Sequence, residues 1–166
     1  MNEYTIFLSH LVALARMVSV SKLVLATDHA GFMLKEAVKK HLEEQGIQVT
    51  DVGTFSDDPV DYPAIIRKGC ETALKEGIPG IVFGGSGIGE SIAANKVRGI
   101  RAARCSTVED AQLSRAHNDA NVLSLGGRTL ETPLAIRMVD VFLSTPFDGG
   151  RHTARVNDLE IPPLPA

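Results

Sequence analysis

Two stretches of the chain combine residue types that can move protons. Asp28-His29-Ala30-Gly31 follows a short apolar run, and Glu90 follows the glycine-rich stretch Gly84-Gly85-Ser86-Gly87-Ile88-Gly89. A carboxylate suits the removal of a proton from carbon when partial burial raises its pKa toward neutrality. Structural roles are open as well, because Asp28 can cap a following helix and Glu90 can complement the dipole of a helix that starts at the loop.

The glycine-rich stretch favours the binding of an anion. Its four glycines among six residues let backbone N–H groups converge on a phosphate or on a developing oxyanion. No Gly-Lys-Ser/Thr follows, so the stretch is not a P-loop, and Glu90 stands where a dinucleotide fingerprint has its third glycine. A tight turn that holds no ligand is the alternative interpretation.

Two further clusters lie in the second half of the chain. His117-Asn118-Asp119-Ala120-Asn121 sets an imidazole among short polar side chains, just before a predicted strand. Arg151 and Arg155 are one helical turn apart, so both guanidinium groups can reach one phosphate. A structural histidine and a solvated, charged helix face are the alternatives for these two clusters.

The elements around these residues predict an α/β fold: a Rossmann-like three-layer α/β/α sandwich with a five-stranded parallel sheet. Short runs of aliphatic and β-branched residues indicate strands at 22–27, 47–52, 80–83, 100–104 and 122–125. They alternate with helical patterns, which is typical of a sheet covered by helices on both faces. Ligands of such folds bind at the carboxyl ends of the strands.

Helix ends are predicted from capping and breaking residues. One helix starts at Asp61-Tyr62-Pro63 and ends near Gly77, with a buried face of Ile65, Ile66, Cys70, Ala73 and Leu74. Ser106-Thr107-Val108-Glu109 fits a capping box. Thr132-Pro133 is expected to cap and start a helix that runs to about Phe142.

Length and charge describe one ordinary globular domain. The chain has 166 residues and a net charge of −3 with interleaved signs, which argues against a nucleic-acid binder. We expect an N-terminal extension over 1–21, a domain over 22–160 and an irregular tail over 161–166. The extension is too short and too interrupted for a membrane span and lacks the features of a secretory signal, which leaves a weak organelle-targeting segment as the alternative. Two distant cysteines, Cys70 and Cys105, favour a reduced, cytoplasmic protein.

Taken together, the motifs resemble those of type B ribose-5-phosphate isomerases, relatives of the galactose-6-phosphate isomerase subunits. The resemblance covers about Lys22 to Asp158 and rests on Asp28–Gly31, Gly85–Gly89, Ser91–Lys96, His117–Asn121 and Gly149–Arg155. It implies a doubly wound α/β fold and the reversible conversion of ribose 5-phosphate to ribulose 5-phosphate, a step of the pentose phosphate pathway. It also implies a homodimer with sites shared across the interface (a tetramer is the alternative), and no metal, organic cofactor, nucleic acid or membrane partner.

The resemblance also implies roles for individual residues. His117 would be the acid that helps to open the furanose ring, and substrate contacts would come from Asp28, His29, Gly85, Gly87, Ile88, Gly89, Asn118, Arg128, Arg151 and Arg155. Many members have a cysteine base where this chain has Gly84, whereas a second branch has a glutamate after the loop, as Glu90 is here. We therefore hypothesise that Glu90 is the base, that Ser86 and the loop amides steady the enediolate, and that Asp28 assists ring opening.

Three other functions remain open at this stage. A six-carbon sugar phosphate, such as allose or galactose 6-phosphate, is an alternative substrate. A non-catalytic phosphosugar-binding protein is suggested by the missing cysteine. A flavodoxin-like nucleotide-binding module is supported only by the fold pattern and the glycine-rich stretch.

Overall fold

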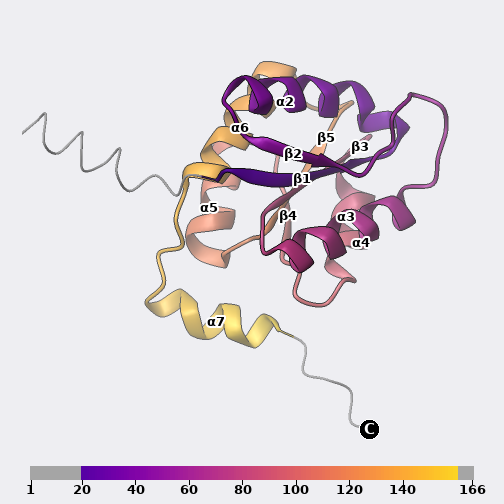
Figure 1. The fold of residues 1–166 in the computed structure, drawn as a ribbon. Helices are drawn as coiled ribbons and strands as arrows, with labels where there is room; N and C mark the ends of the chain where they lie inside the picture. The colour runs from indigo at the N-terminus through magenta and orange to yellow at the C-terminus, as the bar shows by residue number, and fades with distance from the viewer. Residues whose placement is uncertain (1–19, 161–166) are drawn as a thin grey trace, which may run out of the picture.

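The computed structural model describes residues 20–160, and within this range the strands form one fully parallel sheet (Figure 1). Its five strands have the order β2-β1-β3-β5-β4. Their bounds are β1 Lys22–Thr27, β2 Gln48–Asp51, β3 Gly80–Gly84, β4 Ala102–Arg104 and β5 Val122–Gly126. Each strand lies within two residues of its predicted bounds, because buried parallel strands read as short continuous apolar runs.

Helices cover both faces of the sheet, which confirms the predicted three-layer α/β/α sandwich. The helices of the described part are η1 His29–Gly31, α2 Phe32–Glu44, α3 Tyr62–Glu76, α4 Ile88–Asn95, α5 Val108–Asn118, α6 Thr132–Ser144 and α7 Arg151–Leu159. The first apolar cluster joins the sheet to α2, α5 and α6, and the second joins its other face to α3 and α4. None of these helices is long and apolar enough to cross a membrane.

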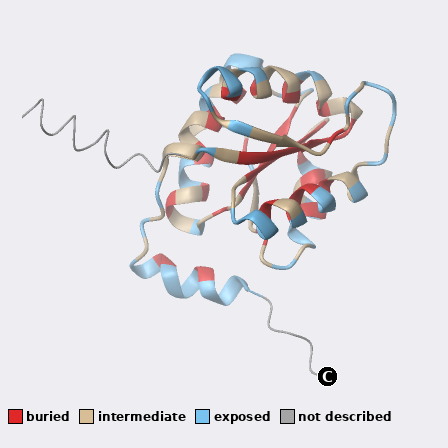
Figure 2. Ribbon diagram, viewed as in Figure 1, coloured by how far each residue is buried: buried red, intermediate tan, exposed pale blue. Residues whose placement is uncertain are grey.

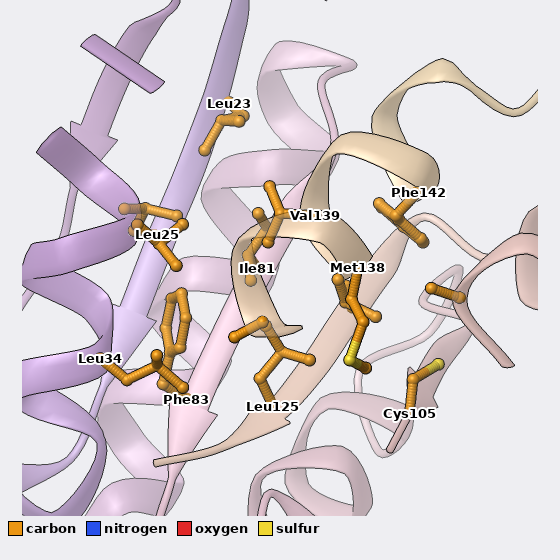
Figure 3. Close-up of a cluster of buried hydrophobic side chains, with 14 of the residues drawn as sticks. Leu23, Leu25, Leu34, Ile81, Phe83, Cys105, Leu125, Met138, Val139 and Phe142 are labelled. Carbon is orange, nitrogen blue, oxygen red and sulfur yellow. The ribbon is translucent and has the colours of Figure 1, made fainter. Parts of the chain in front are cut away.

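The larger half of the core lies under α2 and α6 (Figure 3). Leu23 and Leu25 of β1 face this side, whereas Ala26 of the same strand packs into the cluster under α3 and α4. Successive side chains of a strand point to opposite faces, so a strand covered on both sides needs apolar residues at every position. Most of the sheet is accordingly buried, as the red strands of Figure 2 show.

The structure corrects three predicted helix details. The capping box at α5 is formed by Thr107 and Asp110 rather than by residues 106 and 109, because Asp110 reaches back to the amide of Thr107. Glu131, not Thr132, precedes α6 as its N-cap. Leu74 was assigned to the buried face of α3 but is 40% exposed.

Two motif asparagines hold the backbone around the start of β4. The carboxamide of Asn95 donates to the carbonyl of Ala102 at 2.9 Å and accepts from its amide at 2.8 Å. Asn121 accepts from the amide of Arg101 at 2.8 Å and donates to the carbonyl of Gly99 at 2.7 Å. Both residues therefore have structural roles. The predicted extension over 1–21 (save its last two residues) and the tail over 161–166 lie outside the described residues.

Candidate active site

The carboxyl edge of the sheet carries one group of the predicted site residues. Asp28 and His29 follow β1, the glycine loop (residues 84–89) and Glu90 follow β3, and Arg128 follows β5. Because β1, β3 and β5 are neighbours in the sheet, their ends meet at one place. We call these residues the carboxyl-edge group.

Glu90 is the buried acid of this group. It lies in the first turn of α4, is only 3% exposed, and turns its carboxyl group back toward Gly84. A Cβ atom at position 84 would overlap all three atoms of this carboxyl group, so the carboxyl group occupies the space that any side chain at 84 would need. Burial raises the pKa of Glu90, and the neighbouring Asp28 raises it further.

Asp28 and His29 are each held by backbone amides. Oδ1 of Asp28 accepts from the amides of Ala30 and Gly31 at 2.9 and 3.0 Å, so the predicted cap is present and does not require Oδ2. Nδ1 of His29 accepts from the amide of Val60, in the loop that follows β2, at 3.3 Å. Both side chains are thus fixed before any ligand arrives.

The glycine loop has a conformation that its glycines make possible. Gly87 has a φ of 75°, and a Cβ there would lie 2.9 Å from the carbonyl carbon of Leu125, so only glycine fits. The buried hydroxyl of Ser124 donates to the carbonyl of Gly87 at 2.7 Å. Oγ of Ser86 accepts from the amide of Ile88 at 3.3 Å, which leaves the hydroxyl proton of Ser86 free for a ligand.

Arg128 is attached to the loop through its backbone. Its amide donates to the carbonyl of Gly85 at 2.9 Å, and its exposed side chain lies beside the same glycine. A cation is therefore available next to amides that can bind an anion.

A second group of predicted residues lies at the opposite, amino edge of the sheet. His117 and Asn118 end α5 immediately before β5, and the amide of Asp148 donates to the carbonyl of Ala116 at 3.0 Å, which brings the start of α7 to the same place. Arg151 and Arg155 extend from α7 into solvent. We call His117, Asn118, Arg151 and Arg155 the amino-edge group.

The two groups cannot meet within one chain. The five residues of β5 separate His117 from the glycine loop, a distance of about 13 Å along the strand. A catalytic acid must approach the group that it protonates to about 3 Å. His117 precedes β5 whereas the glycine loop follows β3, so a parallel sheet places them at opposite edges.

Three contacts to predicted site residues were not foreseen. His152 stacks on His117 with ring centroids 4.3 Å apart and planes 8° apart, and burial, followed by the nearby charges of His117 and Arg151, lowers the pKa of His152. Arg104 donates through Nε to the carbonyl of Ser86 at 3.2 Å. Gly89 lies against the phenol ring of Tyr62. Only Arg104 had a sequence signal, since it ends a predicted strand.

Neither cysteine can replace the missing thiol base. Both side chains are buried, and burial raises the pKa of Cys70 to about 12 and that of Cys105 to about 11. Such thiols remain protonated at neutral pH and are poor nucleophiles. Among the described residues, no three His, Cys, Asp or Glu side chains gather as they would around a metal ion.

Comparison with known proteins identifies the family of this chain. The family model described as Ribose/Galactose Isomerase matches residues 23–159, nearly all of the described part. The chain belongs to the ribose/galactose isomerase family. Within this family, ribose-5-phosphate isomerase B of Escherichia coli is 45% identical over 138 residues, covering 82% of this chain and 93% of that protein.

Solved structures of family members have the same fold. The crystal structure of a ribose 5-phosphate isomerase from Thermotoga maritima superimposes with a TM-score of 0.83 at 49% identity, covering 84% of this chain and 97% of that one. Ribose-5-phosphate isomerase B from Mycoplasma genitalium, crystallised with bound ribulose-5-phosphate, gives a TM-score of 0.79 at 35% identity over 83% of this chain and 93% of that one.

Proposed function

We propose that the chain is an aldose–ketose isomerase that interconverts ribose 5-phosphate and ribulose 5-phosphate. The observation that carries this proposal is the buried carboxyl group of Glu90 facing the glycine loop in a member of this family. Relatives of similar length carry the name ribose-5-phosphate isomerase B, and one of them was crystallised with ribulose-5-phosphate. These relatives favour a five-carbon substrate over a six-carbon one.

The reaction requires one base that serves two adjacent carbons of an opened sugar. Glu90 removes the proton from the carbon next to the carbonyl and returns a proton to the former carbonyl carbon, passing through an enediolate, while the hydroxyl proton passes from one oxygen to the other. Its raised pKa suits both steps, because a weakly basic carboxylate would remove the proton less readily. The glycine-loop amides and the Ser86 hydroxyl stabilise the enediolate oxygen, and each such donor contributes about 3 kcal/mol.

Ring opening and phosphate binding fall to the amino-edge group, which must come from a second copy of the chain. In the proposed homodimer, His117 of one copy reaches the carboxyl-edge group of the other, and Asp28 assists it. Arg151 and Arg155 then hold the phosphate from the same side as His117.

Three observations support a shared site. The two groups lie at opposite edges of one sheet. Helix α7 buries only His152 and Val156 of its nine residues, so most of its surface has no partner among residues 20–160 of its own copy (Figure 2). Ile88 and Ile92 of α4, beside the glycine loop, are 54% and 56% exposed. Large aliphatic side chains at such positions are typical of a protein interface.

Mixing two inactive variants tests both the reaction and the sharing of sites. Glu90→Gln and His117→Asn each disable both sites of a homodimer, whereas a mixed dimer keeps one site with both wild-type groups. Random mixing after dissociation and reassociation therefore restores about a quarter of wild-type isomerisation of ribose 5-phosphate. Two copies of Glu90→Gln that retain activity would refute the base assignment, and a mixture that stays inactive would refute the sharing.

Substrate size is tested with the wild-type enzyme. We expect ribose 5-phosphate to be turned over much faster than allose 6-phosphate or galactose 6-phosphate, and a reversed order would establish the six-carbon alternative. We also propose that the enzyme works in the cytoplasm and requires neither metal nor organic cofactor. Full activity after treatment with a chelator and dialysis is the expected result.

A further inference from the structure

A backbone amide of the loop between β2 and α3 (residues 52–61) contacts one of the candidate site residues. The amide of Val60 donates to Nδ1 of His29 at 3.3 Å. A neutral imidazole carries one proton, and a ring nitrogen that accepts a hydrogen bond is the one without it. In the neutral form of His29, this hydrogen bond places the proton on Nε2, the ring nitrogen that Val60 does not contact.

A buried lysine anchors the beginning of this loop. Nζ of Lys35 donates to the carbonyl of Thr54 at 2.9 Å and to Oδ2 of Asp51 at 2.7 Å, and the Lys35 side chain is fully buried. The ring of Phe55 lies 5.2 Å from the same ammonium group. Burying a lysine is costly unless its charge is paired, so Asp51 pairs the charge while the same ammonium group links Thr54 of the loop to α2.

The loop is tied to the strand that carries His29 as well. The amide of Thr54 donates to the carbonyl of Thr27 at 2.8 Å, and the amide of Thr27 donates to the carbonyl of Gly53 at 2.7 Å. At its far end the loop enters α3 at Tyr62. The amide of Val60 therefore belongs to a segment that is bonded to the end of β1 at its start and continues into α3 at its end.

We propose that Val60 and Lys35 are positioning residues that fix His29 as a hydrogen-bond donor to the sugar through Nε2. Asp28 and His29, which follow each other at the end of β1, then offer the ligand a carboxylate acceptor and an N–H donor. Hydroxyl and ring oxygens of a sugar can accept a hydrogen bond from such an N–H. His29 would therefore donate to one sugar oxygen, and Asp28 would accept from a neighbouring hydroxyl group. The identity of the ligand rests on the proposed function, whereas the protonation pattern of His29 does not.

The pattern can be read without any substrate. In protein labelled with ¹⁵N-histidine, two-bond ¹H–¹⁵N couplings identify the protonated ring nitrogen, and the His29→Gln variant assigns the signal. We expect wild-type His29 to carry its proton on Nε2. Val60→Pro, which removes the amide donor, should give a mixture of tautomers, and Val60→Ala, which keeps the amide, should match the wild type. Lys35→Met releases Thr54 and serves as a second test if Val60→Pro does not fold.

In kinetics, variants that lose the hydrogen bond to His29 should bind the sugar more weakly. Losing one neutral hydrogen bond that orients His29 should raise KM for ribose 5-phosphate about 3- to 10-fold with a smaller change in kcat. His29→Gln, which keeps an N–H donor, should retain more activity than His29→Glu, which has none when ionised. A wild-type proton on Nδ1, or an unchanged tautomer in Val60→Pro and Lys35→Met, would overturn the proposal. Failure of the wild type to isomerise ribose 5-phosphate would instead overturn the proposed function and leave the tautomer result intact.

Discussion

The contact between Gly84 and Glu90 allows the proposed base to be displaced without being replaced. In Gly84→Ala the new methyl group would occupy the place of the Glu90 carboxyl group. Non-bonded carbon atoms approach to about 3.5 Å, so the carboxyl group must retreat by more than about 1 Å. A displacement of this size in a catalytic group costs about 100-fold in rate. The amino-edge group lies at the opposite edge of the sheet from position 84, so KM should change little.

The assay is the steady-state formation of ribulose 5-phosphate from ribose 5-phosphate, with kcat and KM determined separately. Gly80→Ala is the matched control, because it adds the same methyl group to the other end of β3, where its nearest neighbour would be Val122 at 3.4 Å. The control should keep kcat close to the wild-type value. Thermal unfolding of both variants shows whether any loss of rate reflects loss of fold.

A double-mutant cycle then decides how Gly84→Ala acts. If the methyl group works only by displacing the Glu90 carboxyl group, Gly84→Ala combined with Glu90→Ala should be no slower than Glu90→Ala alone. Additive losses would mean that the methyl group damages the glycine loop itself. A kcat for Gly84→Ala within about threefold of the Gly80→Ala control would refute the assignment of Glu90 as the base, since a misplaced base should cost far more.

Three further outcomes follow from the charges in the structure. Burial raises the pKa of Glu90 above its ordinary 4.5. In a pH profile, kcat/KM should therefore fall to half its maximum at a pH above 4.5, as Glu90 takes up its proton. An acid-side midpoint at or below pH 4.5 would contradict the buried carboxylate. Burial alone would raise the pKa of Asp51, but hydrogen bonds from Lys35, the Gly53 amide and Lys39 outweigh it and hold the pKa below 3.8. Asp51 therefore stabilises the fold above about pH 4 and loses this contribution as the pH falls through its folded pKa. In urea unfolding, the free energy of unfolding that Asp51→Asn loses relative to the wild type should shrink between about pH 5 and pH 2. A loss that stays constant over this range would contradict the lowered pKa. Since the pKa values of Cys70 and Cys105 are raised to about 12 and about 11, iodoacetamide at pH 7.5 should leave the rate unchanged, and rapid inactivation would reveal a thiol in the chemistry.

The sequence predicted the sheet and the carboxyl-edge group well for a physical reason. Strands buried on both faces need uninterrupted apolar residues, so Lys22–Thr27 and Gly80–Gly84 are visible as runs, and the polar residues that follow them must lie at one edge. The same parallel topology puts His117, which precedes β5, at the other edge. The resemblance grouped the two edges together because it implies a site shared between two copies of the chain.

Contacts between distant elements were beyond the sequence. The stack of His152 on His117 depends on how the segment after α6 returns to α5, and no local pattern encodes that return. The fit of the Glu90 carboxyl group beside Gly84 depends on the left-handed turn at Gly87, which folds the first turn of α4 back onto β3. The capping box was predicted one residue early because Glu109 and Asp110 are both plausible partners until the cap residue is known.

The pairing of Asn95 with Ala102 also bears on how copies of this protein can associate. Arg101 and Cys105 bond to β5 through their backbone, so Ala102 between them faces outward along the open border of β4. Its two polar groups are taken by one carboxamide, which denies that border to an incoming strand in the way that natural sheets guard against aggregation. An incoming strand therefore cannot pair with Ala102, which disfavours a continuous sheet running through two molecules along β4.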